Sequence, residues 1–171
     1  MKHLIVVDMQ NDFCTGTLAN KDAVAIIPKI AELLEKAKAD GDNIIFTQDT
    51  HYEDYLETGE GKHLPVKHCI QGTEGWEIVP DLKKLAPEDA TFIAKNHFGF
   101  DNWAKYIKPG DEVTIVGTVT SICVLSNAVI LKTIENVEVT VVENACADLT
   151  KTRHNAALEA MTSCQCNIVQ L

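Results

Sequence analysis

Leu4-Ile5-Val6-Val7-Asp8-Met9-Gln10-Asn11-Asp12-Phe13, close to the N-terminus, is the stretch that decides the fold. Its first four residues form a continuous β-prone apolar run, which is typical of a strand buried on both faces of a parallel sheet. The run stops at Asp8, so we expect this carboxylate at the carboxyl end of the strand. Parallel α/β sheets bind ligands beyond that end. Asp8 is therefore the first candidate functional residue.

Strand-like and helix-like segments alternate along the rest of the chain. Predicted strands cover 43–47, 91–94, 113–117, 137–142 and 167–170, and predicted helices cover 22–40, about 122–134 and about 151–162. Such alternation implies right-handed βαβ crossovers. We expect a single α/β domain over residues 1–171, with a mostly parallel central sheet and helices on both faces in a Rossmann-like three-layer arrangement.

Composition narrows the class of protein. The chain has 171 residues, of which 46% are hydrophobic, enough for one packed core. Fifteen basic and twenty-five acidic residues give a net charge of −10 without a basic cluster, which argues against a nucleic-acid or membrane partner. No apolar stretch reaches the roughly 20 residues of a membrane span, and the N-terminus lacks an export signal. We expect a soluble, cytoplasmic homo-oligomer whose partner is a small molecule.

Three reactive side chains are expected at one edge of this sheet. Asp8 follows the first strand, Lys95 follows the third, and Cys123 lies just beyond the fourth at the start of a helix. The helix macrodipole would lower the pKa of a thiol there. A nearby carboxylate could take the thiol proton, and an ammonium group would favour the thiolate. Taken singly, each residue also fits an ordinary structural role as a packed cysteine, a turn aspartate or a solvated lysine.

The polar segment from Gln48 to about Gly75 is too long for a simple connection and is expected to be functional. It contains Asp49, His51 and His68. Two imidazoles and a carboxylate suit a divalent metal ion with open water positions. Histidines scattered in a polar loop are also commonly just solvated, so composition alone leaves both interpretations open.

Three motifs resemble those of the isochorismatase-like cysteine hydrolases. The segment 5–13 is similar to the opening motif of the family, Ile93-Ala94-Lys95 to its lysine strand, and Val116-Gly117-Thr118-Val119-Thr120-Ser121-Ile122-Cys123-Val124 to its nucleophile segment. The resemblance implies the same fold and a catalytic triad, namely Asp8, Lys95 and Cys123. It also implies a cis peptide between Thr118 and Val119, with the N–H groups of Val119 and Cys123 forming an oxyanion hole.

The long polar segment resembles the metal site of the nicotinamidase branch of this family. The matching residues are Asp49-Thr50-His51, followed later by Pro65 and by His68-Cys69. The resemblance implies that Asp49, His51 and His68 bind one divalent ion, with zinc expected and manganese or iron as alternatives.

Two positions depart from the nicotinamidase pattern. Tyr55 stands where that pattern often has a further histidine, and Pro65 where it often has a tryptophan. Phe13 and Phe98 are then expected to form the aromatic wall around a substrate.

The resemblance predicts hydrolysis of nicotinamide to nicotinate and ammonia through a cysteine thioester. Two alternatives stay open. One is a related cysteine amidase acting on another small amide, such as a carbamoyl or ureide compound, and the other is a non-catalytic binding domain of the same fold. An isochorismate hydrolase is disfavoured because Cys123 occupies the nucleophile position.

Overall fold

The computed structural model describes residues 1–171 and is built around a six-stranded, wholly parallel sheet. The strands are β1 (Lys2–Val7), β2 (Asn43–Asp49), β3 (Thr91–Lys95), β4 (Glu112–Thr118), β5 (Glu138–Ala147) and β6 (Asn167–Val169). Their order across the sheet is β3-β2-β1-β4-β5-β6. The winding direction reverses between β1 and β4, which is where ligands bind in such sheets. The predicted fold class is confirmed.

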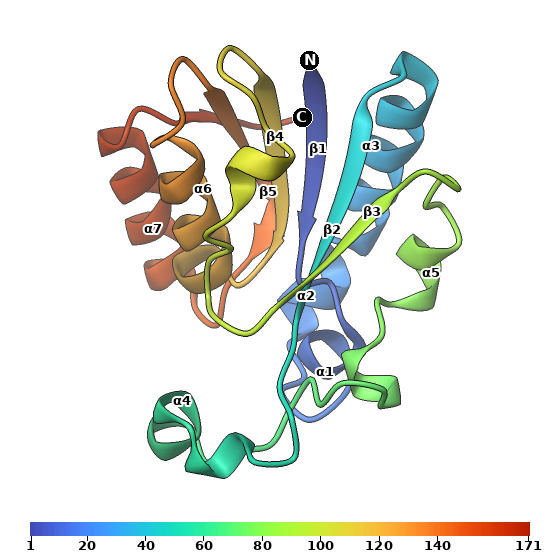
Figure 1. Ribbon diagram of the computed structural model, residues 1–171, viewed down its shortest axis with the longest axis vertical. Coiled ribbons are helices and arrows are strands. Elements are labelled where there is room, and N and C mark those ends of the chain that lie inside the picture. Colours follow the sequence, from blue (N-terminus) through green and yellow to red (C-terminus); the bar gives the residue numbers. More distant parts are fainter.

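Helices cover both faces of the sheet (Figure 1). One face carries α2 (Lys21–Ala25), α3 (Ile27–Asp40) and α5 (Pro80–Lys83), and the other carries α6 (Leu125–Leu131) and α7 (Lys151–Ser163). Successive side chains of a strand point to opposite faces. In β1, Leu4 and Val6 join the core beneath α3, whereas Ile5 and Val7 join the core beneath α6 and α7. This explains why the decisive stretch is apolar at every position.

Two helical predictions need correction. The helix predicted over 22–40 is two helices, α2 and α3, which separate at Ile26. Pro28 has no N–H with which to continue the hydrogen-bond ladder from α2, and its ring suits the first turn of α3. The helix predicted over about 122–134 begins as a π-helical turn, η4 (Thr120–Val124), before α6. Such π-helical turns are frequent at functional sites.

The long polar segment carries short helices of its own. They are η1 (Tyr55–Glu57), α4 (Gly59–His63) and η2 (Glu74–Trp76). Two further short helices lie elsewhere in the chain, α1 (Asn11–Cys14) and η3 (Trp103–Lys105). In Figure 1 the part that contains α4 projects away from the sheet. Its two ends meet at a bridge in which His51 N–H donates to Cys69 C=O and Gln71 N–H to His51 C=O, both at 2.9 Å. None of the helices is long and apolar enough to cross a membrane.

Gly117 allows β4 to approach the end of β1. Its φ is +122°, and a Cβ atom there would lie 2.2 Å from the carbonyl oxygen of Val7. Any side chain would therefore meet backbone, which cannot rotate away. Gly117 directly precedes the turn that carries Cys123, so the fold brings that turn beside Asp8.

We predict that Gly117→Ala lowers the free energy of unfolding by at least about 2 kcal/mol, because it combines a disfavoured φ with a backbone clash. Urea denaturation measures this loss. Gly59→Ala is the matched control, since a Cβ at Gly59 meets nothing within 4 Å. The control should stay within about 0.5 kcal/mol of the wild type. Equal stabilities for the two variants would contradict the close approach at Gly117.

Candidate active site

Asp8 lies where β1 ends, completely buried between the ends of neighbouring strands. Its backbone is in the left-handed region with a φ of +49°, a conformation that aspartate tolerates better than most residues. Thr47, its neighbour on β2, donates from Oγ1 to Asp8 Oδ1 at 2.6 Å. This hydrogen bond fixes Oδ1, and the second carboxylate oxygen, Oδ2, faces Lys95 at the end of β3.

Lys95, the last residue of β3, contacts the other two predicted reactive side chains, Asp8 and Cys123. Its Nζ lies 2.6 Å from Asp8 Oδ2 and 3.7 Å from Cys123 Sγ, and it donates to the carbonyl oxygen of His97 at 3.2 Å. All three predicted residues are buried. The structure therefore brings Asp8, Lys95 and Cys123 into one cluster, as the positions at three strand ends suggested.

The charges of this cluster are balanced against burial. Burial disfavours the ammonium of Lys95, but the carboxylates of Asp8 and Asp49 raise its pKa above the ordinary value, so it stays charged. Burial raises the pKa of Asp8, and the ammonium opposes that rise. Asp8 is thus a carboxylate of raised basicity beside a fixed cation, which suits a group that accepts a proton.

The expected lowering of the Cys123 thiol pKa is wrong. Burial raises this pKa well above its ordinary value, and the attraction of Lys95 does not outweigh the combined effects of burial and the nearby Asp8 carboxylate. Cys123 also lies inside the η4 turn rather than in the first turn of a regular helix. The resting side chain is consequently a neutral thiol, and it needs a base before it can act as a nucleophile.

The turn that carries Cys123 begins at a cis peptide bond between Thr118 and Val119, as the resemblance implied. Ser121 N–H in this turn donates to Asp148 Oδ2 at 2.6 Å. The N–H of Val119, by contrast, donates to no acceptor within the protein. This group is therefore free to donate to a ligand, the role that the predicted oxyanion hole would give it.

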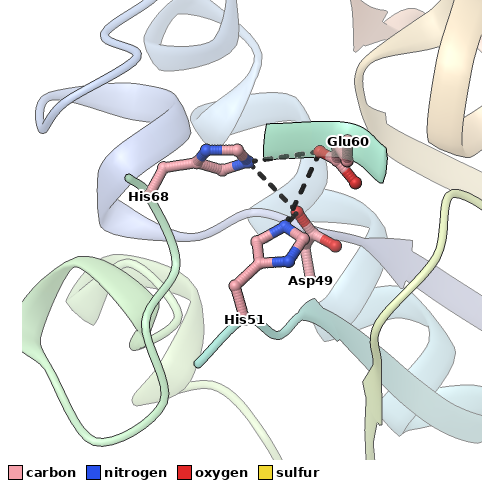
Figure 2. Close-up of side chains that lie close together, drawn as sticks. All are labelled: Asp49, His51, Glu60 and His68. Carbon is pink, nitrogen blue, oxygen red and sulfur yellow. Dashed lines mark hydrogen bonds and ion pairs between the residues drawn. The ribbon is translucent and has the colours of Figure 1, made fainter. Parts of the chain in front are cut away.

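A second cluster lies beside the first. Its four side chains point toward one another in Figure 2, and they are Asp49, His51, Glu60 and His68. Their potential ligand atoms all lie within 4.8 Å of one another. Asp49 Oδ2 lies 3.0 Å from His51 Nε2 and 3.5 Å from His68 Nε2. The three predicted ligands are therefore together, and they form a candidate metal centre.

Glu60 is a member of this cluster that sequence reasoning missed. Its Oε1 lies 3.7 Å from Nε2 of both histidines, and it comes from α4 (Figure 2). The available signal was Tyr55, which stands where a further histidine was expected and thus called for another donor nearby. Tyr55 itself does not face the centre as a donor, because its hydroxyl donates to the carbonyl oxygen of Leu64 at 2.8 Å while its ring packs edge-on against both imidazoles.

Backbone and side-chain contacts hold these donors in place. The Gln10 side chain accepts from Asp49 N–H at 2.7 Å and donates to Asp49 C=O at 2.8 Å, which pins the end of β2 to the segment after β1. His68 Nδ1 lies 2.8 Å from the carbonyl oxygen of Val66, so its Nε2 faces the centre. Metal-ligating histidines are commonly oriented in this way.

The donor set fits a divalent cation. Burial would raise the pKa of Asp49, but hydrogen bonds from the two histidines and the charge of Lys95 lower it well below its ordinary value. Burial and the neighbouring Asp49 charge raise the pKa of Glu60. Two imidazoles with two closely spaced carboxylates are a common set for zinc and related ions, and a cation would relieve the repulsion between the carboxylates.

Both clusters open into one pocket of about 1360 Å³. Cys123 and Val119 line it on the side of the buried trio, and Asp49, His51, Glu60 and His68 line it on the other. Phe13 and Phe98, the predicted aromatic wall, both line it too. The pocket therefore presents a thiol and a candidate metal centre to the same ligand.

The sequence matches a family profile over almost its whole length and curated relatives over three quarters of it. Residues 2–171 match the profile of the isochorismatase domain. The nicotinamidase/pyrazinamidase of Mycobacterium tuberculosis is 31% identical, over 75% of this chain and 77% of that protein. The nicotinamidase of Saccharomyces cerevisiae is 29% identical, over 75% of this chain and 80% of that protein.

Solved structures agree with these sequence matches. The pyrazinamidase of Pyrococcus horikoshii, solved in complex with zinc, superposes with a TM-score of 0.84 at 33% identity over 99% of both chains. The pyrazinamidase/nicotinamidase of Streptococcus mutans superposes with a TM-score of 0.87 at 28% identity, over 99% of this chain and 100% of that chain. The likeness therefore includes the sheet edge at which the buried trio lies.

We predict that Glu60→Gln weakens zinc binding at least about tenfold, because the substitution removes a negative donor while keeping its shape. Competition with a chromogenic chelator measures the affinity. Glu53→Gln serves as the control, because Glu53 is on the same segment but is an exposed partner of Lys67. Equal zinc affinity in the two variants would show that Glu60 is not a ligand.

Proposed function

Because the chain belongs to the isochorismatase family, we propose that it is a nicotinamidase-type amidohydrolase that converts nicotinamide to nicotinate and ammonia. One observation carries the proposal. A buried thiol, with a carboxylate and an ammonium group beside it, shares a pocket with a centre of two histidines and two carboxylates. The first cluster supplies the chemistry of amide cleavage, and the second suits the capture of a heteroaromatic ring.

In the proposed reaction, the Asp8 carboxylate takes the proton of the Cys123 thiol, and the thiolate attacks the amide carbon. The carbonyl oxygen gains negative charge as the carbon–sulfur bond forms. The N–H groups of Val119 and Cys123 donate to that oxygen. The Lys95 ammonium, 3.7 Å from the sulfur, stabilises the thiolate and holds Asp8 in place.

Collapse of this intermediate breaks the carbon–nitrogen bond. Asp8 returns its proton to the leaving nitrogen, so ammonia departs and an acyl thioester remains on Cys123. A water molecule then attacks the thioester, with Asp8 accepting its proton. Departure of the sulfur releases nicotinic acid, which loses its proton to solvent to give nicotinate, and the proton on Asp8 restores the thiol.

The remaining lining residues would bind and orient the substrate. Asp49, His51, Glu60 and His68 would hold one divalent cation, which is proposed to be zinc because the residues fit it and the related Pyrococcus protein was solved with that metal. When bound, the cation would supply a positive charge able to anchor a pyridine nitrogen. Phe13, whose ring centroid lies 5.7 Å from that of His68, and Phe98 would enclose the ring of the substrate.

A second candidate is an amidase for a larger amide on the same triad. The pocket volume of about 1360 Å³ favours it, since sites for drug-sized ligands commonly have about 300–1,000 Å³ and nicotinamide is a single ring. Pro65, which stands where the nicotinamidase pattern often has a tryptophan, also keeps this candidate open.

Ammonia release from a panel of amides tests the proposal and separates these candidates. The panel contains nicotinamide, pyrazinamide, benzamide, an N-carbamoyl amino acid and an amide with a bicyclic acyl group, each assayed with zinc-loaded protein. We expect nicotinamide to be hydrolysed much faster than benzamide, which has the same shape without the ring nitrogen. Faster turnover of the carbamoyl or bicyclic compound would replace nicotinamidase with the second candidate. No turnover of any compound would favour a binding domain.

For the triad, we predict that Cys123→Ala abolishes turnover without loss of the fold. Asp8→Asn and Lys95→Ala should each lower kcat at least about a hundredfold, the usual scale for a general base or a preorganised charge. The double variant should lose far less than the product of the two effects, as groups that act together do. Steady-state kinetics with circular dichroism on each variant provides the measurement.

Cys166→Ala is the control for the nucleophile, since Cys166 is a buried thiol in the core beneath α7. It should keep wild-type turnover. Retained activity in Cys123→Ala, or fully multiplicative losses for Asp8 and Lys95, would remove the triad assignment.

A further inference from the structure

Asn127 lies on α6, one turn beyond Cys123, and is completely buried. Its side-chain amide offers two donors and can accept two hydrogen bonds. Nδ2 donates to the carbonyl oxygen of Cys123 at 2.8 Å and to that of Phe98 at 3.3 Å. Oδ1 accepts from Phe100 N–H and from Trp103 Nε1, both at 2.9 Å. Every polar position of this side chain is therefore used.

These bonds join two parts of the site that are distant in sequence. One bond reaches the backbone of the nucleophile, and three reach the segment 96–103, which follows Lys95 and contributes Phe98 to the pocket. The same segment supplies the His97 carbonyl that accepts from Lys95. Its position thus affects both the pocket wall and the ammonium group.

The packing of Gly99 independently shows how closely this segment lies on α6. A Cβ atom at Gly99 would come within 2.4 Å of Ile130 Cδ1 and 3.3 Å of Ser126 Cβ, two side chains of α6. The backbone of the segment therefore rests directly on the helix. Trp103 and Phe100 also anchor the segment in the core. Phe98 is exposed, and the hydrogen bonds to Asn127 fix the backbone on both sides of it.

We propose that Asn127 is a positioning residue that fixes the segment 96–103 to the turn of Cys123, and so sets the distance between the Phe98 wall and the nucleophile. This inference rests on the proposed amidase function for its kinetic consequences. A plain structural role would require only that Asn127 keep the protein folded. A positioning role requires in addition that its loss impair substrate binding in protein that is still folded.

Asn127→Asp is the most informative variant. It keeps an acceptor for Phe100 and Trp103 but removes the amide donors to Cys123 and Phe98, whereas Asn127→Ala removes all four bonds. Asp111→Asn is the matched control, because Asp111 is also buried and is bonded to three groups at the opposite end of β4. The readouts are KM and kcat per folded molecule and hydrogen–deuterium exchange of the segment 96–103.

We expect both Asn127 variants to raise KM for the substrate about tenfold, which corresponds to the loss of roughly one net hydrogen bond. Exchange at the segment 96–103 should rise by a similar factor while β5 and β6 keep wild-type protection. Asp111→Asn should change neither quantity. Should Asn127→Ala fail to fold, Asn127→Asp and Trp103→Phe, which removes one donor to Asn127, still decide the question.

Kinetic constants and local exchange within about twofold of wild type in Asn127→Asp would overturn the proposal. Faster exchange spread evenly over the whole sheet would overturn it as well, since that result describes global destabilisation. If the wild-type protein cleaves no amide of the panel, the proposed function fails. The exchange measurement then still shows whether Asn127 holds the segment.

Discussion

The ion pair between Lys95 and Asp8 is the interaction on which the rest of the site depends. A buried ammonium is costly unless charged partners surround it, and removal of one partner of such a pair typically costs about 3–5 kcal/mol. Here the partners come from strand ends, with Asp8 directly after β1 and Asp49 at the end of β2 meeting the last residue of β3. The parallel sheet therefore provides the charge balance that allows Lys95 to stay ionised next to a neutral thiol.

Asp49 connects the two halves of the site. Its Oδ1 lies 3.7 Å from Lys95 Nζ, and its Oδ2 faces the two histidines of the candidate metal centre. One carboxylate thus contributes to the charge of both clusters. The spacing between the Lys95 cluster and the candidate metal centre is consequently set by the end of β2, and Gln10 clamps that end through both backbone groups of Asp49. A substrate that spans the two clusters would meet a fixed separation, which favours amides of one particular size and shape.

The sequence predicted the features that depend on periodicity and on strand ends. Apolar runs located the strands. Asp8 and Lys95 directly after two runs, and Cys123 a few residues beyond a third, were therefore expected at one edge. The thiol pKa was not predictable in this way, since macrodipole arguments assume a regular helix and ignore burial, and Cys123 is buried in a π-helical turn. Glu60 was missed because α4 returns toward His51 only through tertiary contacts, including the Tyr55 hydroxyl on Leu64. Asn127 was missed for the same reason, since nothing local marks an asparagine that bonds to a distant loop.

Tyr55 supports the candidate metal centre without being one of its donors. An edge-on aromatic ring next to two imidazoles restricts their rotation, and its hydroxyl ties η1 to the end of α4. Thr58 caps α4 by accepting from Gly61 N–H at 3.0 Å, which places Glu60 in the first turn of this helix. The fourth donor of the candidate centre is therefore a carboxylate on a short helix. A carboxylate adds negative charge that an imidazole would not. The candidate centre should therefore bind a divalent cation more strongly than a three-histidine centre of the same shape. The bound cation, being more fully neutralised, should in turn attract a neutral ligand less strongly.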